Sequence, residues 1–348
     1  MARTRARLAA ETRRTLADLG YEEVETPCLV PAPGMEPHLS PFQARFEPEG
    51  GGAPRPLWLI TSPEYAMKRL LAEGFERVFQ LSRVFRNGEV SATHNPEFTM
   101  LEFYRAGTGY GGIMADLERL VESAARALGV GEAGHGPGRS DGARAATGAP
   151  RARRGGRALD LSTPFERLTV QQAFQRHAGV DLAACGGDAG ALRAAARGAG
   201  HDAGPEGEPF DDAFFRLMLS AVEPRLGLTR PTFLTDWPAS MAALSRVKAD
   251  DPRWAERFEL YAGGLELANG FTELTDPVEQ RARLVEEQAL RARLGRPALP
   301  LDEDFLAALS RMPDAGGVAV GFDRLLMLLT GAETIEEVLL FPASGFLR

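Results

Sequence analysis

The stretch VFQLSRVFRNGEVSATHNPEFTMLEFYR, residues 78–105, decides the fold that we predict for this chain. Two runs of alternating apolar and polar residues flank a polar tip that contains a glycine, a pattern typical of two long paired β-strands. Side chains two apart on a strand share a face, so Met100, Glu102 and Tyr104 lie together. This concentration of ionisable groups indicates a binding surface, although charged residues on strands are usually just exposed.

The composition is that of an ordinary globular protein. Its 348 residues carry a net charge of −8, which argues against a broad nucleic-acid-binding surface and against tRNA binding. No apolar run approaches the roughly 18 residues that span a bilayer, and the N-terminus lacks the apolar segment of a signal peptide. Cys28 and Cys185 lie far apart without metal-binding spacing, so we expect neither a disulfide framework nor a zinc site. A reducing, cytoplasmic location is expected.

Periodicity, helix caps and glycines predict helices and strands along the whole chain. The predicted helices are 3–19, 63–73, 112–128, 170–178, 214–222 and 276–294. The predicted strands are 21–30, 57–60, two within 78–105, 159–170, 231–238, two within 257–274, and 317–321. The helix at 276–294 is highly charged, which predicts a solvated face.

Residues 131–158 contain no Leu, Ile, Val, Met or aromatic residue. Such a segment cannot bury enough apolar surface to offset the entropy of ordering, so we expect a disordered surface insertion. Its six arginines leave contact with an acidic partner open as an alternative to a solvated spacer.

Two acidic positions have alternative interpretations. Glu64 falls in the first turn of a helix that Ser62 caps, where a carboxylate is favoured by the helix dipole alone. Glu266 and Glu273 lie seven residues apart, and the intervening Asn269–Gly270 predicts a bulge that would bring both to one side of a strand. Two carboxylates at one site repel unless a cation separates them, so Mg²⁺ or a substrate ammonium is expected there. Two unrelated surface acids are the alternative.

The segment GGVAVGFDRLLMLLTG, residues 316–331, predicts a strand of small residues that runs into a helix near Asp323. Glycines allow a ligand to approach the strand closely, and Arg324 beside the helix N-terminus suits an anion. Neither a G-x-x-x-x-G-K-[ST] phosphate loop nor a G-x-G-x-x-G fingerprint is present, which argues against Walker-type and Rossmann nucleotide binding.

Four blocks together resemble those of the class II aminoacyl-tRNA synthetases, and of the lysyl branch in particular: FRNGE (85–89), HNPEFTMLE (94–102), ELANGFTEL (266–274) and GVAVGFDRLLML (317–328). TPC at 26–28 resembles the first class II motif, which usually lies at a dimer interface. The resemblance covers about residues 5–345, outside 131–158. It implies the α+β catalytic core of class II synthetases, a mixed, mostly antiparallel sheet flanked by helices, and a homodimer.

A lysyl-tRNA synthetase carries an N-terminal anticodon-binding barrel before its first motif, whereas here a single predicted helix precedes that motif. The chain therefore most resembles the stand-alone lysyl-synthetase paralogues that modify translation elongation factor P. The resemblance implies that residues 1–348 form one catalytic domain, with an insertion at 131–158 and no anticodon-binding domain.

The resemblance implies an ATP-dependent ligase that uses Mg²⁺. It would activate (R)-β-lysine or lysine as an adenylate and transfer it to a lysine side chain of elongation factor P. A truncated synthetase that charges tRNA or another acceptor, and a non-enzymatic dimeric paralogue, are the alternatives. The non-enzymatic alternative is disfavoured because both motif arginines, Arg86 and Arg324, and both carboxylates of residues 266–274 are present.

The same resemblance implies roles for individual residues. Those that bind the amino acid would be Ser62, Glu64, Glu102, Tyr104, Glu273 and Ala319. Those that bind the nucleotide would be Arg86, Glu89, Asn95, Glu266, Leu267, Gly321 and Arg324. Arg86 and Arg324 would be catalytic, since a guanidinium stays charged and can neutralise phosphate oxygens. Glu266 and Glu273 would hold Mg²⁺.

Two positions depart from the family pattern. The second motif normally places a glutamate two residues after its arginine, but here Gly88 stands there and the acid follows as Glu89. Ala319 stands where lysyl-tRNA synthetases usually have glycine. The added methyl group would crowd an α-amino group, which favours a substrate whose amine is one carbon further along.

Overall fold

The computed structural model describes residues 1–131 and 150–347 of the chain. The chain divides into two compact units. Unit 1 comprises Met1–Gly109, Glu273–Met327 and Ala332–Arg348, and unit 2 comprises Tyr110–Thr272 and Leu328–Gly331. Residues 132–149, most of the segment predicted to be disordered, lie outside the described residues. That residues 1–348 act as one catalytic domain stays a prediction.

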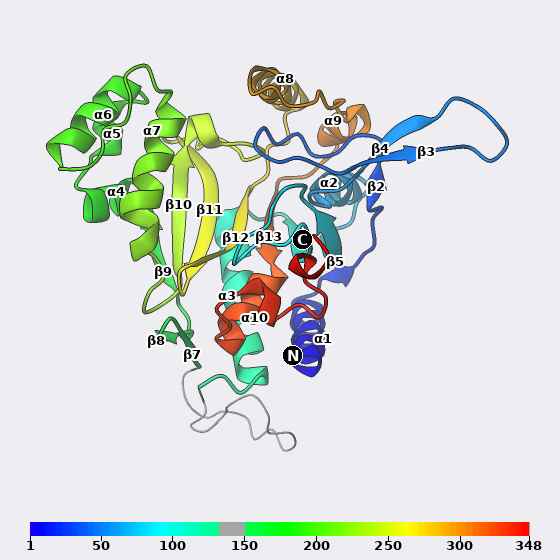
Figure 1. Ribbon diagram of the computed structural model, residues 1–348, viewed down its shortest axis with the longest axis horizontal. Helices are drawn as coiled ribbons and strands as arrows, with labels where there is room; N and C mark the ends of the chain where they lie inside the picture. Colours follow the sequence, from blue (N-terminus) through cyan, green and yellow to red (C-terminus); the bar gives the residue numbers. More distant parts are fainter. Residues whose placement is uncertain (132–149, 348) are drawn as a thin grey trace. The chain divides into compact units, whose positions relative to one another are not determined.

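The hairpin predicted at residues 78–105 forms the middle of the sheet in unit 1 (Figure 1). The strands of this unit follow the order β1 (Glu22–Glu23), β5 (Arg77–Phe85), β6 (Glu97–Ala106) and β13 (Ala315–Gly321). Strand β6 pairs antiparallel with both β5 and β13, whereas β1 pairs in parallel with β5. The predicted hairpin and the strand predicted at 317–321 are therefore confirmed.

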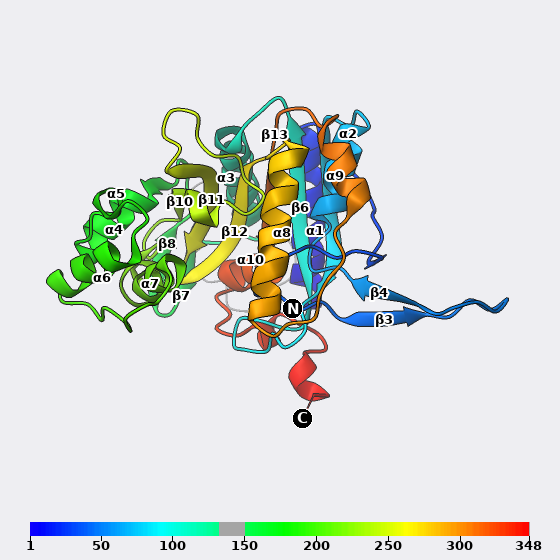
Figure 2. The same ribbon diagram turned by 90° about the horizontal axis from the view of Figure 1, so that it is seen from above.

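Helices of unit 1 largely follow the predicted ranges. They are α1 (Ala2–Asp18), α2 (Glu64–Ala72), α8 (Pro277–Arg293), α9 (Glu303–Leu309) and α10 (Phe322–Thr330), whose last three residues belong to unit 2, with short 3₁₀ turns at Ile335–Glu337 and Ala343–Gly345. Figure 2 shows α8 beside α9. The solvated face predicted for α8 is wrong at Arg291, whose buried guanidinium donates to the carbonyl oxygens of Glu36 and Leu39. Those acceptors replace the water that a buried guanidinium loses.

The single strand predicted at 21–30 is wrong in its middle. Only β1 and β2 (Leu29–Val30) are extended and paired, since Pro27 between them has no N–H to donate to a ladder. Strand β2 pairs with β4 (Arg55–Leu59), which also pairs with β3 (Gln43–Phe46). The β3–β4 hairpin projects from the rest of unit 1 in both ribbon views.

Four strands of unit 2 follow the order β12 (Leu265–Thr272), β11 (Trp254–Ala262), β10 (Thr232–Pro238) and β9 (Glu166–Thr169). Strand β11 pairs antiparallel with β12 and β10, whereas β10 and β9 are parallel. Both units therefore carry the mixed, mostly antiparallel strand arrangement that was predicted. The strand-like segment predicted at 159–170 is confirmed only at its two ends.

The helices of unit 2 are α3 (Tyr110–Ala127), α4 (Val170–Ala178), α5 (Leu182–Cys185), α6 (Ala189–Gly198) and α7 (Phe210–Leu217), followed by a π-turn (Met218–Val222), a 3₁₀ turn (Glu223–Arg225) and, after β10, a second 3₁₀ turn (Ala239–Met241). Helix α4 begins with a capping box in which Thr169 and Gln172 satisfy each other's backbone N–H groups. The rings of Phe174 and Phe214 stack, and Trp237 packs against Phe214. This core anchors the small helices to β10.

The disorder predicted for residues 131–158 is wrong for its last residues. Strands β7 (Arg151–Arg154) and β8 (Arg157–Asp160) pair as an antiparallel hairpin. Gly155 and Gly156 both have positive φ, the conformation of a tight two-residue turn. The hairpin buries Ala152 and Leu159, and Leu159 lies just beyond the stretch judged by composition.

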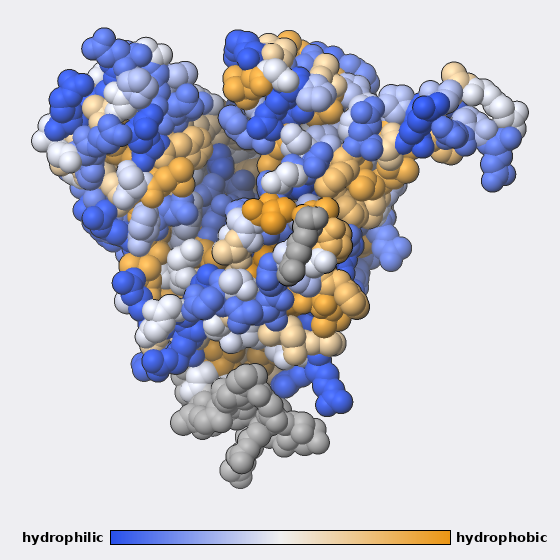
Figure 3. Space-filling view, viewed as in Figure 1, coloured by the Kyte–Doolittle hydropathy of each residue, from blue (hydrophilic) through white to orange (hydrophobic). Residues whose placement is uncertain are grey.

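Cys28 and Cys185 are both free thiols, in agreement with the absence of a predicted disulfide framework. None of the helices in the described part of the chain combines the length and apolarity needed to cross a membrane. The cytoplasmic location stays a prediction. Apolar side chains are exposed around the C-terminal segment (orange in Figure 3), and those exposed there are Leu340, Phe341, Phe346 and Leu347.

Candidate active site

Three strands of unit 1 bring most of the predicted amino-acid-binding residues together. In the ladder, Glu102 of β6 lies between Gln80 of β5 and Ala319 of β13. Tyr104 pairs with Gly317, two positions along. Paired residues share a face of the sheet, so Glu102, Tyr104 and Ala319 line one surface, as the period-two pattern predicts.

The Glu102 carboxylate is fully buried and is held by two hydroxyl groups. Ser62 Oγ donates to Oε1 at 2.6 Å, and the Tyr104 hydroxyl donates to Oε2 at 2.8 Å. Burial, and secondly the nearby Glu64 carboxylate, raises the pKa of Glu102 to about 8, because both disfavour the charged form. Ser62 Oγ also accepts the backbone N–H of Glu64 at 3.0 Å, so this hydroxyl connects the first turn of α2 to the sheet.

A buried lysine that the sequence analysis missed joins two of the predicted carboxylates. Lys68 Nζ lies 2.5 Å from Glu64 Oε1 and 2.5 Å from Glu273 Oε2, and its side chain is 1% exposed. Burial lowers the pKa of Lys68, but Glu273 and Glu64 more than offset this effect and raise it. Glu64 and Lys68 have the i,i+4 spacing of a helical ion pair. That spacing is a usable signal, but most such pairs lie at the surface.

Glu273 completes a group that we call the acidic cluster: Glu64, Glu102 and Glu273. Burial raises the pKa of Glu273, and repulsion from Glu64 and Glu102 acts in the same direction against the attraction of Lys68. Both oxygens of Glu273 are buried without a hydrogen-bond partner among the described residues, and of the two only Oε2 forms an ion pair, with Lys68. A Cβ on Gly317 would lie 2.4 Å from Oε1 and 2.3 Å from the Tyr104 ring, so only glycine lets both groups pack this close to the strand.

The acidic cluster suits a ligand that carries ammonium groups. Leaving a buried acceptor unpaired costs roughly 1–3 kcal/mol, and an ammonium that donates to Glu273 Oε1 would remove that cost. An ammonium near Glu102 would also favour its charged form. The Glu64 side chain is 17% exposed, so the cluster is not sealed from solvent.

Arg86 follows β5 and is placed to meet an anion. Its guanidinium lies over the Phe98 ring, 5.2 Å from the centroid, and its Nε is buried without a hydrogen-bond partner among the described residues. Glu89 Oε1 lies 3.9 Å from Arg86 Nη1. Gly88 has φ of +88°, where a residue with a side chain would be strained, which gives a physical reason for an acid at 89 instead of 88.

Arg324 lies in the first turn of α10 and contacts the loop between β5 and β6. Its Nη2 donates to His94 Nε2 at 2.6 Å, and its Nε donates to the Thr93 carbonyl oxygen at 3.4 Å. A Cβ on Gly321 would meet nothing but the Arg324 side chain, at 3.5 Å or more. The described residues therefore leave this face of β13 open beside a guanidinium, which fits a flat anionic ligand.

Asn95, predicted to touch the nucleotide, is buried and has two backbone contacts. Its Nδ2 donates to the Glu97 carbonyl oxygen at 2.6 Å, and its Oδ1 accepts the Ala343 N–H at 2.9 Å. An asparagine amide has two N–H donors and two lone pairs, so one of each remains. The two bonds show that Asn95 holds the loop and the C-terminal segment together.

In unit 2, Glu266 lies in a second group of charged residues. Strand β12 carries a bulge between Glu266 and Ala268, so Glu266 pairs with Tyr261 while Asn269 pairs with Glu259. The predicted bulge exists, but it lies at Leu267 and not at Asn269–Gly270, which keep regular pairing. Leu267 is buried, so only its backbone is available for the predicted nucleotide contact.

Glu259 is the buried member of this second group. It pairs with Arg257 at 2.7 Å and accepts the Tyr261 hydroxyl. Burial, and next the charge of Glu266, raises the pKa of Glu259 to about 7. Sequence analysis missed both Glu259 and Arg257, although their alternation in RFELY is the signal of a charged strand face. Among the described residues, no group of three or more His, Cys, Asp or Glu side chains is arranged to hold a metal ion by itself.

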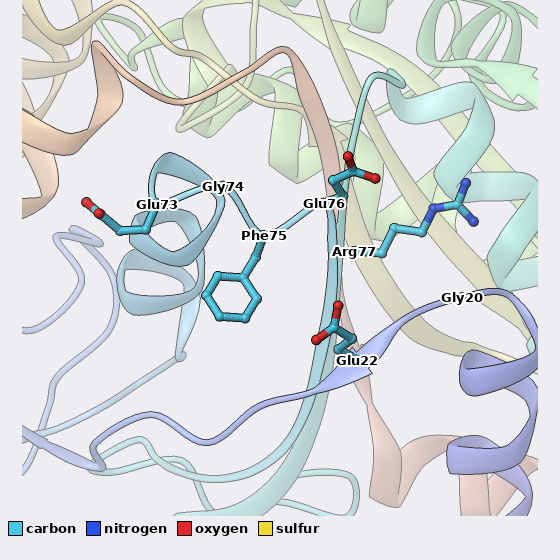
Figure 4. Close-up of a pocket in the computed structure, with 7 residues that line it drawn as sticks. All are labelled: Gly20, Glu22, Glu73, Gly74, Phe75, Glu76 and Arg77. Atoms are coloured by element: carbon cyan, nitrogen blue, oxygen red, sulfur yellow. The ribbon is translucent and has the colours of Figure 1, made fainter.

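A cavity of about 520 Å³ elsewhere in unit 1 contains none of the predicted site residues (Figure 4). It is lined by Gly20, Glu22, Glu73, Gly74, Phe75, Glu76 and Arg77. Glu73 pairs with Arg311, and Arg77 donates to the Leu19 carbonyl oxygen, so these charges already have partners. The cavity does not belong to the candidate active site.

Residues 1–345 match the family described as tRNA synthetases class II (D, K and N). The chain belongs to this family, whose members are ATP-dependent ligases. Its relatives include the elongation factor P–(R)-β-lysine ligases of Salmonella paratyphi B, Salmonella schwarzengrund and Salmonella paratyphi C. Each is 41% identical to it over 339 residues, which is 97% of this chain and 93% of theirs. The resemblance found from the sequence and the predicted fold class are thereby confirmed.

Proposed function

We propose that this protein activates (R)-β-lysine, or lysine, with ATP and transfers it from the adenylate to a lysine side chain of translation elongation factor P. The name and near full-length similarity of its relatives support this activity. The observation that carries the choice of substrate class is the buried Glu102 carboxylate, held by Ser62 and Tyr104 within the acidic cluster. Such a carboxylate suits a diamino acid and disfavours an apolar one.

The acidic cluster binds the amino groups of the substrate. Glu102 receives one ammonium, oriented by the hydroxyl groups of Ser62 and Tyr104. Glu273 receives the other at Oε1, whose lack of a partner supports this assignment. Ala319 lies opposite Glu102 and limits the space beside it.

The nucleotide binds along β13 and the β5–β6 loop. Arg86 and Arg324 face the phosphates, with Glu89 placed to orient Arg86, and Gly321 leaves room for the adenine ring. Asn95 supports the loop and reaches the nucleotide with its remaining N–H. A substrate carboxylate is already ionised, so the arginines need only orient two anions and neutralise developing charge.

Mg²⁺ would supply charge neutralisation on the phosphates when bound. Its predicted ligands are Glu266 and Glu273. Glu266 fits this role, because it lies beside Glu259 in a set of oxygen donors whose mutual repulsion a hard cation relieves. Glu273 has Oε2 paired with Lys68, which favours a role on the substrate side. Leu267, the residue after Glu266, would contact the nucleotide through its backbone.

The protein acts as a homodimer through the segment around TPC, residues 26–28. Leu29 of β2 and Phe46 of β3 are large apolar side chains exposed on the three-stranded sheet that follows this segment. A second copy that covers them would bury this surface. Sedimentation velocity tests this proposal, and a monomer at micromolar concentration would contradict it.

The central assay supplies ATP, Mg²⁺ and (R)-β-lysine with either elongation factor P or bulk tRNA. We expect elongation factor P to gain the mass of one β-lysyl group by mass spectrometry, while tRNA stays uncharged. Arg86→Ala should lower the rate by about a hundredfold or more, since it removes a cation from the developing phosphate charge.

Arg83→Ala is the matched control for that variant. Arg83 lies three residues earlier on β5, is half exposed, and its nearest carboxylate oxygen on Glu97 is 3.8 Å away. Its substitution should leave the rate unchanged. Charged tRNA with unmodified elongation factor P would show that the alternative, a truncated synthetase, is correct. No product with either acceptor and no lysine-dependent use of ATP would favour a non-enzymatic paralogue.

Ala319 sets the preference between the two lysine isomers. Ala319→Gly removes the methyl group opposite Glu102, so the ratio of kcat/KM for α-lysine to that for β-lysine should rise about tenfold, the usual effect of one methyl group in a pocket. Ala315→Gly removes a methyl group from the same strand opposite Ala106 and should change nothing. An unchanged ratio in Ala319→Gly would show that this methyl group does not select the substrate.

A further inference from the structure

Lys68 places a positive charge of the protein itself inside the acidic cluster. It comes from the second turn of α2, and its ammonium lies 2.5 Å from one oxygen of Glu64 and 2.5 Å from one oxygen of Glu273. The side chain is 1% exposed and Glu273 is as deeply buried. A lysine at this depth is rare unless it is paired.

The Lys68 ammonium links Glu64 on α2 to Glu273 in the segment after β12. By holding one oxygen of each carboxylate, it fixes the direction of the other. Glu273 Oε1 is thereby turned towards Gly317 and the Tyr104 ring, where it has no hydrogen-bond partner among the described residues. Lys68 therefore orients the oxygen that is left for a ligand.

Lys68 also determines the net charge of the acidic cluster. When a bound ammonium ligand favours the charged form of all three carboxylates, the acidic cluster together with Lys68 carries two negative charges. A diamino acid supplies two ammonium groups, which balances them, while its own carboxylate remains for the nucleotide. Without Lys68, one buried carboxylate would stay uncompensated, and a buried unpaired charge is costly.

Other acids act on the exposed side of the cluster. The charges of Glu36 and Glu64 raise the pKa of the half-buried Glu287, whereas the charge of Arg283 lowers it. These groups add negative charge around Glu64. They increase the need for an internal cation beside it.

We propose that Lys68 is a positioning residue that aims Glu273 and sets the acidic cluster to accept two ammonium groups of the substrate. This inference rests on the proposed function and deepens it. A purely structural explanation is weaker, because a buried ion pair can often be replaced by apolar residues without loss of stability. An apolar side chain at position 68 alone would leave Glu64 and Glu273 without this ammonium.

The test compares the wild-type chain with Lys68→Ala, Lys68→Met and Lys68→Arg. The measurement is lysine-dependent exchange of pyrophosphate into ATP, with KM determined separately for lysine and for ATP. In Lys68→Met, kcat/KM for lysine should fall about a hundredfold, because loss of the ammonium leaves buried carboxylates unpaired. KM for ATP should stay unchanged, because Arg86 is unaltered. Lys68→Arg keeps the charge and should retain more activity than Lys68→Met.

Chemical rescue separates charge from packing. Lys68→Ala lacks the atoms of propylammonium, so added propylamine should restore exchange at least tenfold, whereas propan-1-ol, which is similar in size but neutral, should not. Equal rescue by both compounds, or full activity of Lys68→Met, would overturn the inference. If Lys68→Ala fails to fold by circular dichroism, Lys68→Met and Lys68→Arg carry the test, and equal activity of these two variants overturns the inference.

Failure of the inference and failure of the proposed function give different results. Wild-type protein without lysine-dependent exchange contradicts the proposed function, and the role of Lys68 in substrate binding falls with it. Active wild-type protein whose lysine KM does not respond to substitution of Lys68 contradicts the role of Lys68 alone.

Discussion

The structure of the candidate active site depends on the burial of the Glu102 carboxylate between three strands. Moving a carboxylate out of water is strongly unfavourable unless hydrogen bonds or cations compensate. Here Ser62 and Tyr104 donate to its two oxygens, while Glu64 and Glu273 add like charge and Lys68 adds a cation. The apo protein therefore holds an electrostatic imbalance that an ammonium ligand relieves. Binding specificity follows from this imbalance more than from shape.

Strand register determines which residues can take part. Because Glu102 pairs with Ala319 and Tyr104 pairs with Gly317, a methyl group stands beside the carboxylate, whereas the ring packs directly against the glycine. A shift of one residue would turn Glu102 to the opposite face. The β5–β6–β13 ladder thus places Glu102 and Tyr104, whereas the start of α2 contributes Glu64 and Lys68, with Ser62 in the segment just before it.

The sequence predicted the parts of this site that depend on local periodicity. The shared face of Glu102 and Tyr104 and the strand-to-helix junction at Arg324 follow from alternation and glycines. The predicted cap at Ser62 is wrong, because the helix begins one residue later than predicted, with Pro63, which makes no side-chain capping bond, as its N-cap. The sequence did not predict Lys68 as a buried cation, because the spacing to Glu64 is equally that of a surface pair. Only the packing of α2 against the sheet distinguishes the two. Likewise, composition could not reveal that Arg151–Arg154 pair with Arg157–Asp160, because the buried Leu159 of this hairpin lies just outside residues 131–158. The bulge at Leu267 is a property of the pairing between β11 and β12, which the sequence of one strand does not show.

The most direct test of this account is the number of protons released when lysine binds. With a pKa of about 8, Glu102 is largely protonated at pH 7 in the free protein, and a bound ammonium favours its charged form. Calorimetric titrations in two buffers of different ionisation enthalpy should therefore show release of protons when lysine binds at pH 7. The release should disappear as pH rises well above 8, and it should be smaller in Glu102→Gln, where Glu273 remains to release a proton. Lysine binding at pH 7 without proton release, or equal release by Glu102→Gln, would contradict the claim that this buried carboxylate receives the substrate ammonium.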